Sequence, residues 1–293
     1  MTTVEKPRAA VPAPLLVLTA IASVQVGSAV ARTLFDDLGS AGMTLLRLAI
    51  AAVILGVAFR PKVGAWSAAA WRAAALLGLA MASMSLIFYQ ALETVPLGVA
   101  VTVEFLGPLL LTLAQTRRLV DLLWALLAAG GVALLGLGSG FTAPLGGLLL
   151  AFAAGLCWAG YILASAKLGT LVPGSGGLTV ALAVAALLVL PFGASGASAV
   201  FHHPALLLGA AAVALLSSVF SVSLEINALR RMPTRVFGIL MSLEPGGAAV
   251  AGLVVLHQRL GLREVAALLL VSVASLGVTL ARRGPPAPPI PPA

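Results

Sequence analysis

Three charged residues lie inside long apolar runs of this sequence: Arg47, Glu104 and Glu244. A charged side chain in the hydrocarbon core of a membrane costs about 2.5–3.5 kcal/mol, so it persists only where it faces a cavity or a partner. A carboxylate in that setting can bind a cation or carry a proton, and a guanidinium can hold both oxygens of a carboxylate. These residues are therefore the first candidates for substrate binding or ion coupling.

The depth of each charged residue follows from the helical rise of about 1.5 Å per residue. Arg47 and Glu104 would both lie roughly 10 Å below the outer surface of the hydrocarbon core, so the two could form an ion pair. Glu244 would lie roughly 13 Å from the inner surface, and Pro245 after it frees a backbone carbonyl one turn earlier. For Arg47 and Glu104 a structural ion pair and a substrate contact are both open, whereas Glu244 favours a functional role over a structural one. Glu225, near the inner end of its run, could reach water.

Four uncharged residues in apolar runs are weaker candidates: Gln25, Tyr89, Trp158 and Tyr161. Gln25 lies near the middle of its run. Tyr89 lies at the end of one, where an aromatic ring usually anchors a helix at the membrane interface. Trp158 is deeper and could either line a cavity or pack in the core.

The composition places these residues in a polytopic helical membrane protein. Of the 293 residues, 61% are hydrophobic and 9% are charged, whereas soluble domains carry about 25% charged residues. The apolar runs lack the alternation of a membrane β-barrel, and a spanning helix needs about 20 mainly apolar residues. We therefore predict an all-α fold with ten transmembrane helices, at 13–31, 41–59, 73–91, 97–115, 119–138, 144–166, 177–195, 204–227, 235–257 and 261–281.

Two segments of the sequence match at a fixed offset of 137 residues but carry opposite charge. Residues 91–96 align with residues 228–233. The first segment is acidic through Glu93, and the second is basic through Arg230 and Arg231. Because loops rich in Lys and Arg stay in the cytoplasm, the same five-helix unit would be inserted twice in opposite orientations, as in many secondary transporters.

This repeat predicts the domain organisation. It consists of a cytoplasmic N-tail at 1–12, a first repeat at 13–138, a second repeat at 144–281 and a Pro-rich, disordered tail at 284–293. With both chain ends in the cytoplasm, 13 Lys and Arg residues fall inside and only Arg32, Arg259 and Arg263 fall outside. The first span also resembles a signal peptide, but its apolar stretch is long for one and its removal would leave unequal repeats.

Several ordered runs of the sequence resemble a known family. They are Glu-Phe-Leu-Gly-Pro at 104–108 and the segments 45–49, 92–101, 157–163 and 232–245. Together they are similar to the threonine/homoserine exporter branch of the drug/metabolite transporter superfamily, whose repeat unit is the EamA domain. The resemblance implies ten helices in two inverted five-helix repeats, a bacterial inner (plasma) membrane location, export of small amino acids, and no catalytic residues.

An amino-acid substrate would give the buried charges specific roles. Its ammonium needs an anionic partner, which Glu104 or Glu244 could supply, and its carboxylate suits the planar fork of Arg47. We therefore expect export of a small neutral amino acid by alternating access around a central site. Protons are a further expectation as the coupling ion. The lipid bilayer is the expected surrounding, and no cofactor, metal or nucleic acid is expected.

The chain also departs from the family, and other functions stay open. Members of the family often end the ninth helix with Gly-Glu, whereas this chain reads Leu-His-Gln-Arg-Leu at 256–260 and lacks the acidic residue; the Pro-rich tail is also atypical. Within transport, the alternative is another substrate, such as a lipophilic cation, which would not need Arg47. A membrane-embedded enzyme or sensor is the alternative of another class, but the sequence has no HExxH, CxxC or GxSxG motif and no long loop.

Overall fold

The computed structural model describes residues 11–115, 119–136 and 144–281. All the secondary-structure elements assigned in those ranges are helical, which confirms the all-α prediction for the described part of the chain. Nine helical segments there are long and apolar enough to cross a membrane, and a shorter apolar helix covers Leu122–Leu135. The helices are α1 Ala13–Thr33, α2 Phe35–Phe59, α3 Ala68–Ala91, α4 Leu97–Glu104, α5 Leu106–Ala114, α6 Leu119–Gly136, α7 Leu145–Leu171, α8 Gly176–Ala197, α9 Pro204–Ala214, α10 Ser221–Leu229, α11 Thr234–Met241, α12 Glu244–Leu256 and α13 Leu262–Ala281, with short turns η1 Val63–Ala65, η2 Ser198–Phe201 and η3 Leu215–Phe220.

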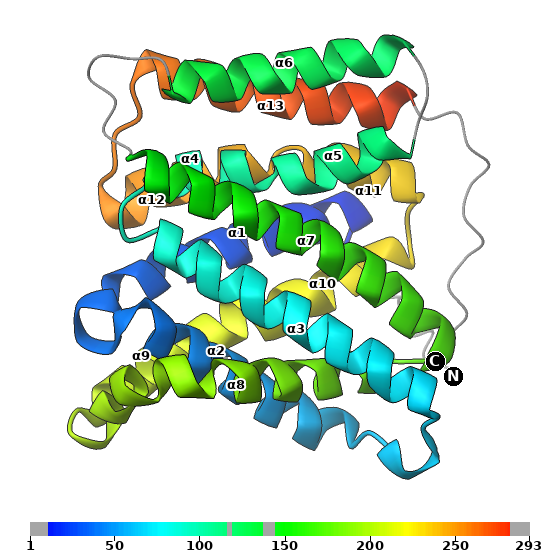
Figure 1. Ribbon diagram of the computed structural model, residues 1–293, viewed down its shortest axis with the longest axis vertical. Coiled ribbons are helices and arrows are strands. Elements are labelled where there is room, and N and C mark those ends of the chain that lie inside the picture. The colour runs from blue at the N-terminus through cyan, green and yellow to red at the C-terminus, as the bar shows by residue number, and fades with distance from the viewer. Residues whose placement is uncertain (1–10, 116–118, 137–143, 282–293) are drawn as a thin grey trace, which may run out of the picture.

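Successive spans run in opposite directions, so their connections alternate between two ends of the bundle (Figure 1). One end, called the basic end below, carries the connections 60–67, 172–175 and 230–233. The opposite end carries the connections 92–96 and 257–261. The predicted tails at 1–12 and 284–293 lie outside the described residues, apart from residues 11 and 12.

The helices pack against one another in pairs. The main pairs are α2 with α8, α3 with α7, α6 with α13, and α1 with the segment formed by α9, η3 and α10. Where α2 crosses α8, a Cβ atom added to Gly42 would fall 2.8 Å from the carbonyl carbon of Gly196. Small residues allow such close backbone approach in lipid, where the hydrophobic effect does not drive helices together. In Figure 1, α1, α4, α7, α10 and α12 lie in the middle of the bundle.

Two of the predicted spans, 97–115 and 235–257, are interrupted rather than continuous. The first divides into α4 and α5 at Phe105, and the second divides into α11 and α12 at Ser242 and Leu243. A proline has no N–H to donate to the carbonyl four residues before it. Pro108 therefore removes the hydrogen bond to the Glu104 carbonyl, at the last residue of α4. Pro245 does the same at the last residue of α11.

Other helix boundaries differ from the predicted spans for identifiable reasons. The structure starts α2 at Phe35, before the predicted residue 41, with a bend at Gly39 (φ 65°). Asp36 and Asp37 lie in the first turn of this helix, where acidic residues are favourable. The predicted eighth span contains the π-helical turn η3 between α9 and α10.

One side chain links the two interrupted helices at the opposite end of the bundle. The backbone N–H of Leu97, the first residue of α4, donates a hydrogen bond to Oε1 of Gln258 over 2.9 Å. Gln258 follows the end of α12, where His257 adopts a left-handed conformation (φ 54°). The Gln258 amide therefore satisfies one of the unpaired N–H groups that begin every helix.

Candidate functional site

Glu244 and Gln25 form a buried polar contact between α12 and α1. Gln25 Nε2 donates a hydrogen bond to Glu244 Oε1 over 3.4 Å. Glu244 is 8% exposed and Gln25 is 3% exposed, while Oε2 of Glu244 and Oε1 of Gln25 have no hydrogen-bond partner. Because Glu244 is the first residue of α12, its carboxylate also lies at the positive end of the helix dipole. The contact thus leaves one carboxylate oxygen free to bind a donor.

Glu104 lies near this contact but is held differently. It is the last residue of α4 and is 8% exposed. Its backbone carbonyl lies so close to Gly155 of α7 that no side chain could replace that glycine without displacement. The charges of Glu244 and Arg47 both act on Glu104 across the interior. Glu104 and Glu244 therefore interact electrostatically, although no hydrogen bond joins their side chains.

The predicted ion pair between Arg47 and Glu104 is not formed. Among the described residues, the Arg47 guanidinium instead lies over the ring of Tyr89, with 4.9 Å from its carbon to the ring centroid. Arg47 Nε is buried without a hydrogen-bond partner. Equal depth in the membrane does not fix the rotation of each helix about its axis, and that rotation turns Arg47 towards α3.

Tyr89 is a second correction, because it is not an interface anchor. Its side chain is 1% exposed and packs against Phe35, with ring centroids 5.3 Å apart. Its hydroxyl lies near the hydroxyl of Ser217 in η3, but the two do not reach hydrogen-bonding geometry and both are unpaired. The sequence interpretation overlooked Ser217, although two adjacent serines in an apolar run were a visible signal.

Trp158 lines a cavity and also packs against a neighbouring ring. Its ring meets that of Phe105 edge to face, with centroids 5.5 Å apart and planes at 71°. Both residues border a cavity of about 280 Å³, together with Glu225 and Met241. Phe105 is the residue between α4 and α5, and Met241 ends α11. This cavity therefore touches both interruptions.

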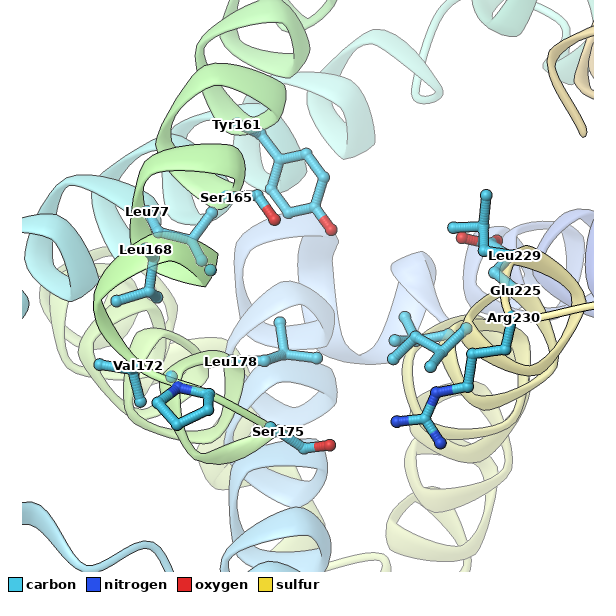
Figure 2. Close-up of a pocket in the computed structure, with 16 residues that line it drawn as sticks. Leu77, Tyr161, Ser165, Leu168, Val172, Ser175, Leu178, Glu225, Leu229 and Arg230 are labelled. Carbon is cyan, nitrogen blue, oxygen red and sulfur yellow. The ribbon is translucent and has the colours of Figure 1, made fainter. Parts of the chain in front are cut away.

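Tyr161 lies in a second cavity, which opens near the basic end of the bundle. This pocket has a volume of about 470 Å³ and is bordered by α3, α7, α8 and α10. Figure 2 shows Tyr161 and Ser165 on one side of it and Glu225 and Arg230 on the other. From the sequence, Glu225 was noted only for its access to water and Arg230 only for topology. Their convergence depends on how four helices pack, which no single segment indicates.

The structure thus distributes the predicted site residues over four places. Gln25, Glu104 and Glu244 lie at the centre, Arg47 stacks with Tyr89 beside α3, and Trp158 and Tyr161 line the two cavities. Within the described ranges, no three His, Cys, Asp or Glu side chains are grouped so that they could hold a metal ion. The charges of these side chains suit them chemically to opposite charges on a small molecule.

Known proteins resemble this chain along most of its length. Residues 145–280 match the EamA-like transporter family. The chain is 40% identical over 274 residues to the threonine/homoserine exporter RhtA of Salmonella typhimurium strain LT2, covering 93% of this chain and 92% of the relative. It is also 40% identical over 280 residues to the threonine/homoserine exporter RhtA of Escherichia coli strain K12, covering 92% of each.

A solved crystal structure, described only as that of a protein, has a similar fold. The TM-score is 0.62 and the sequence identity 18%, with 91% of this chain and 96% of the other covered. At that identity the likeness concerns the fold alone. With the relatives above, the sequence and the fold lead to one assignment. This chain belongs to the EamA-like transporter family of the drug/metabolite transporter superfamily.

Proposed function

We propose that this protein is a secondary transporter that exports small neutral amino acids, such as threonine or homoserine, across the bacterial inner membrane. The observation that carries the proposal is the 40% identity, over 92–93% of the chain, to proteins named threonine/homoserine exporters. The buried polar groups fit such a substrate, because Glu244 at the centre has an unpaired carboxylate oxygen and Arg47, in its stack with Tyr89, has an unpaired guanidinium N–H. These groups complement an ammonium and a carboxylate, respectively.

We infer that the two halves of the chain are inverted repeats that rock around this site. Two observations support this. First, α4 (Leu97–Glu104) and α11 (Thr234–Met241) begin and end at the same offset of 137 residues, yet the spans to which they belong run in opposite directions (Figure 1). Second, the third span (α3) packs on the sixth (α7), and the eighth span (α9, η3 and α10) packs on the first (α1). If the two halves are repeats, the first span corresponds to the sixth and the third to the eighth, so these two contacts are equivalent. Inverted repeats with interrupted helices are typical of alternating-access transporters.

The basic end would face the cytoplasm. Its connections contain Arg60, Lys62, Arg230 and Arg231, and the positive-inside rule places such loops there. Side-specific labelling tests this orientation. In a Cys157→Ala background, Glu93→Cys should react with a membrane-impermeant thiol reagent from outside intact cells, and Arg231→Cys should react only after the membrane is permeabilised. Reaction of both from the same side would contradict the inverted arrangement.

Efflux from loaded membrane vesicles tests the transport function. Labelled threonine, labelled homoserine and a cationic dye serve as probes at equal protein abundance. We expect efflux of both amino acids, and we expect Glu244→Gln to reduce it at least tenfold, because a hydrogen bond to a charged group contributes about 1.5–3 kcal/mol. Full efflux by Glu244→Gln, with unchanged pH dependence, would make Glu244 structural and remove it as a proton carrier.

The cationic dye addresses the second candidate substrate class. Glu104, Glu225 and Glu244 form no ion pair among the described residues, and neighbouring members of the group interact electrostatically. Such a group of carboxyls also suits a lipophilic cation. Arg47→Met separates the two possibilities, because it should abolish amino-acid efflux while leaving dye efflux intact. Loss of the folded protein instead would show that Arg47 serves structure.

A further inference from the structure

The pocket at the basic end, called the vestibule below, contains two opposite charges that do not pair with each other. Glu225 lies in the last two turns of α10, and Arg230 follows the end of that helix. They are five positions apart in the sequence, which corresponds to roughly 7.5 Å along a helix axis. No ion pair joins them in the described structure. Unpaired opposite charges that border one cavity provide two separate binding positions for a ligand with both charges.

The opposite wall of the vestibule offers neutral hydrogen-bonding groups. The side chains of Tyr161 and Ser165 project from α7 towards the cavity that separates them from α10 (Figure 2). Much of the remaining wall is apolar, with Leu77, Leu178 and Leu229 among its residues. A largely apolar pocket with a few convergent polar groups is the usual form of a small-molecule site, and about 470 Å³ lies in the usual size range.

We propose that the vestibule is a second binding site, in which Glu225 holds the ammonium of a zwitterionic amino acid and Arg230 holds its carboxylate. The hydroxyls of Tyr161 and Ser165 would then hydrogen-bond a hydroxyl on the ligand side chain. The identity of the ligand rests on the proposed function. The existence of a site for a zwitterion rests on the geometry of the vestibule itself.

Glu225 also connects the vestibule with the interior. It borders both the vestibule and the cavity of about 280 Å³ that contains Phe105, Trp158 and Met241. Met241 ends α11, directly before the interruption that leads to Glu244. Glu225 also acts electrostatically on Glu244. Because Glu225 borders both cavities, we infer that an ammonium group held there passes through the inner cavity towards Glu244, so that the vestibule loads the central site from the cytoplasm.

Direct binding to the purified full-length protein in lipid nanodiscs tests this site. The measurement uses a Glu244→Gln background, which removes the carboxylate of the central site. The probes are threonine, 1-amino-2-propanol, which lacks the carboxylate, and 3-hydroxybutyrate, which lacks the ammonium. We expect threonine to bind at least tenfold more tightly than either fragment. Adding Glu225→Gln or Arg230→Gln should weaken threonine binding at least tenfold.

Arg231→Gln is the matched control, because it removes the same charge from the next residue, which is exposed and does not border the vestibule. It should bind threonine as the background does. Glu225→Asp and Arg230→Lys keep the charges and should restore part of the affinity. The thermal unfolding midpoint of each variant separates weak binding from a damaged fold.

The outcomes distinguish failure of this inference from failure of the proposed function. Equal threonine binding by Glu225→Gln, Arg230→Gln and the background overturns the inference, and so does the absence of threonine binding. Equal affinity for threonine and 1-amino-2-propanol overturns it as well, because the site would then recognise only an amine. If threonine binds through both charges but vesicles show no efflux, the inference stands and the proposed export function fails.

Discussion

Glu104 is the last residue of α4, whereas Glu244 is the first residue of α12. Both carboxyls lie beside the interruption of their span, yet on opposite sides of it. A helix carries a partial positive charge at its N-terminus and a partial negative charge at its C-terminus. The dipole of α12 therefore favours the carboxylate of Glu244, and the dipole of α4 opposes that of Glu104. Both interrupted spans have a proline just after the break, but they do not share an acidic position.

The two interruptions also differ in how tightly they are packed. Gly107 lies directly against the backbone of Gly155 in α7, whereas a Cβ atom added to Gly246 would meet nothing within 4 Å. The first interruption is thus fixed against a neighbouring backbone, while the second is open at Gly246 and meets only side chains at Gly247, where an added Cβ atom would fall 2.7 Å from Cγ2 of Ile21. This difference indicates that α11 and α12 can change their mutual angle more easily than α4 and α5 can. Glu244 would then belong to the more mobile half of the site.

The largest effect expected from this comparison is that of Gly107→Ala. The added methyl would collide with backbone atoms of Gly155, which cannot move aside as a side chain can. We expect a loss of about 3 kcal/mol in stability, near the upper end of overpacking effects, and a lower thermal midpoint by roughly 10 °C. Gly246→Ala is the control and should change stability by less than about 0.5 kcal/mol. Equal midpoints for both variants would remove the packing difference.

A smaller effect should separate the two carboxyls in the efflux assay. Glu104→Gln removes a negative charge that the dipole of α4 disfavours at the end of that helix. The Glu104 carboxyl has no side-chain hydrogen bond to lose among the described residues. We expect its efflux rate to fall less than about threefold, against at least tenfold for Glu244→Gln, by the magnitudes for charged hydrogen bonds and helix dipoles. The reverse order would place the main ammonium contact on Glu104.

The smallest effect concerns the link between the two interrupted helices. Gln258→Ala removes the acceptor for the N–H of Leu97, and loss of such a contact at a helix N-terminus costs about 1 kcal/mol. The thermal midpoint should fall by roughly 3 °C. Gln258→Glu keeps an acceptor oxygen and should stay close to the wild type. A midpoint unchanged in Gln258→Ala would mean that solvent replaces the bond without loss.

The spans could be predicted from the sequence because the hydrocarbon thickness sets a minimum length for each apolar run. The interruptions were also encoded, since Pro108 and Pro245 each remove one backbone hydrogen bond. They could not be read with certainty, because a proline can bend a helix without dividing it. Element lengths and breaks are local properties, so the sequence indicates them well.

The partners of the buried charges were less predictable. Depth alone suggested that Arg47 would meet Glu104, but helix rotation brings it to Tyr89 instead. The contact between Gln25 and Glu244 joins residues 219 positions apart, and no periodicity in either helix indicates it. Likewise, the vestibule exists only where four helices meet. Such features depend on tertiary packing, which the individual spans do not determine.

The neutral character of Gln258 has a consequence for the energy source of the cycle. Making or breaking its bond to Leu97 transfers no charge through the electric field of the membrane. A carboxylate moved through that field would gain or lose about 2.3 kcal/mol per charge at 100 mV. Breaking the bond between Gln258 and Leu97 should therefore require the same energy in polarised and depolarised vesicles, so that any voltage dependence of export arises at charged residues such as Glu104 and Glu244.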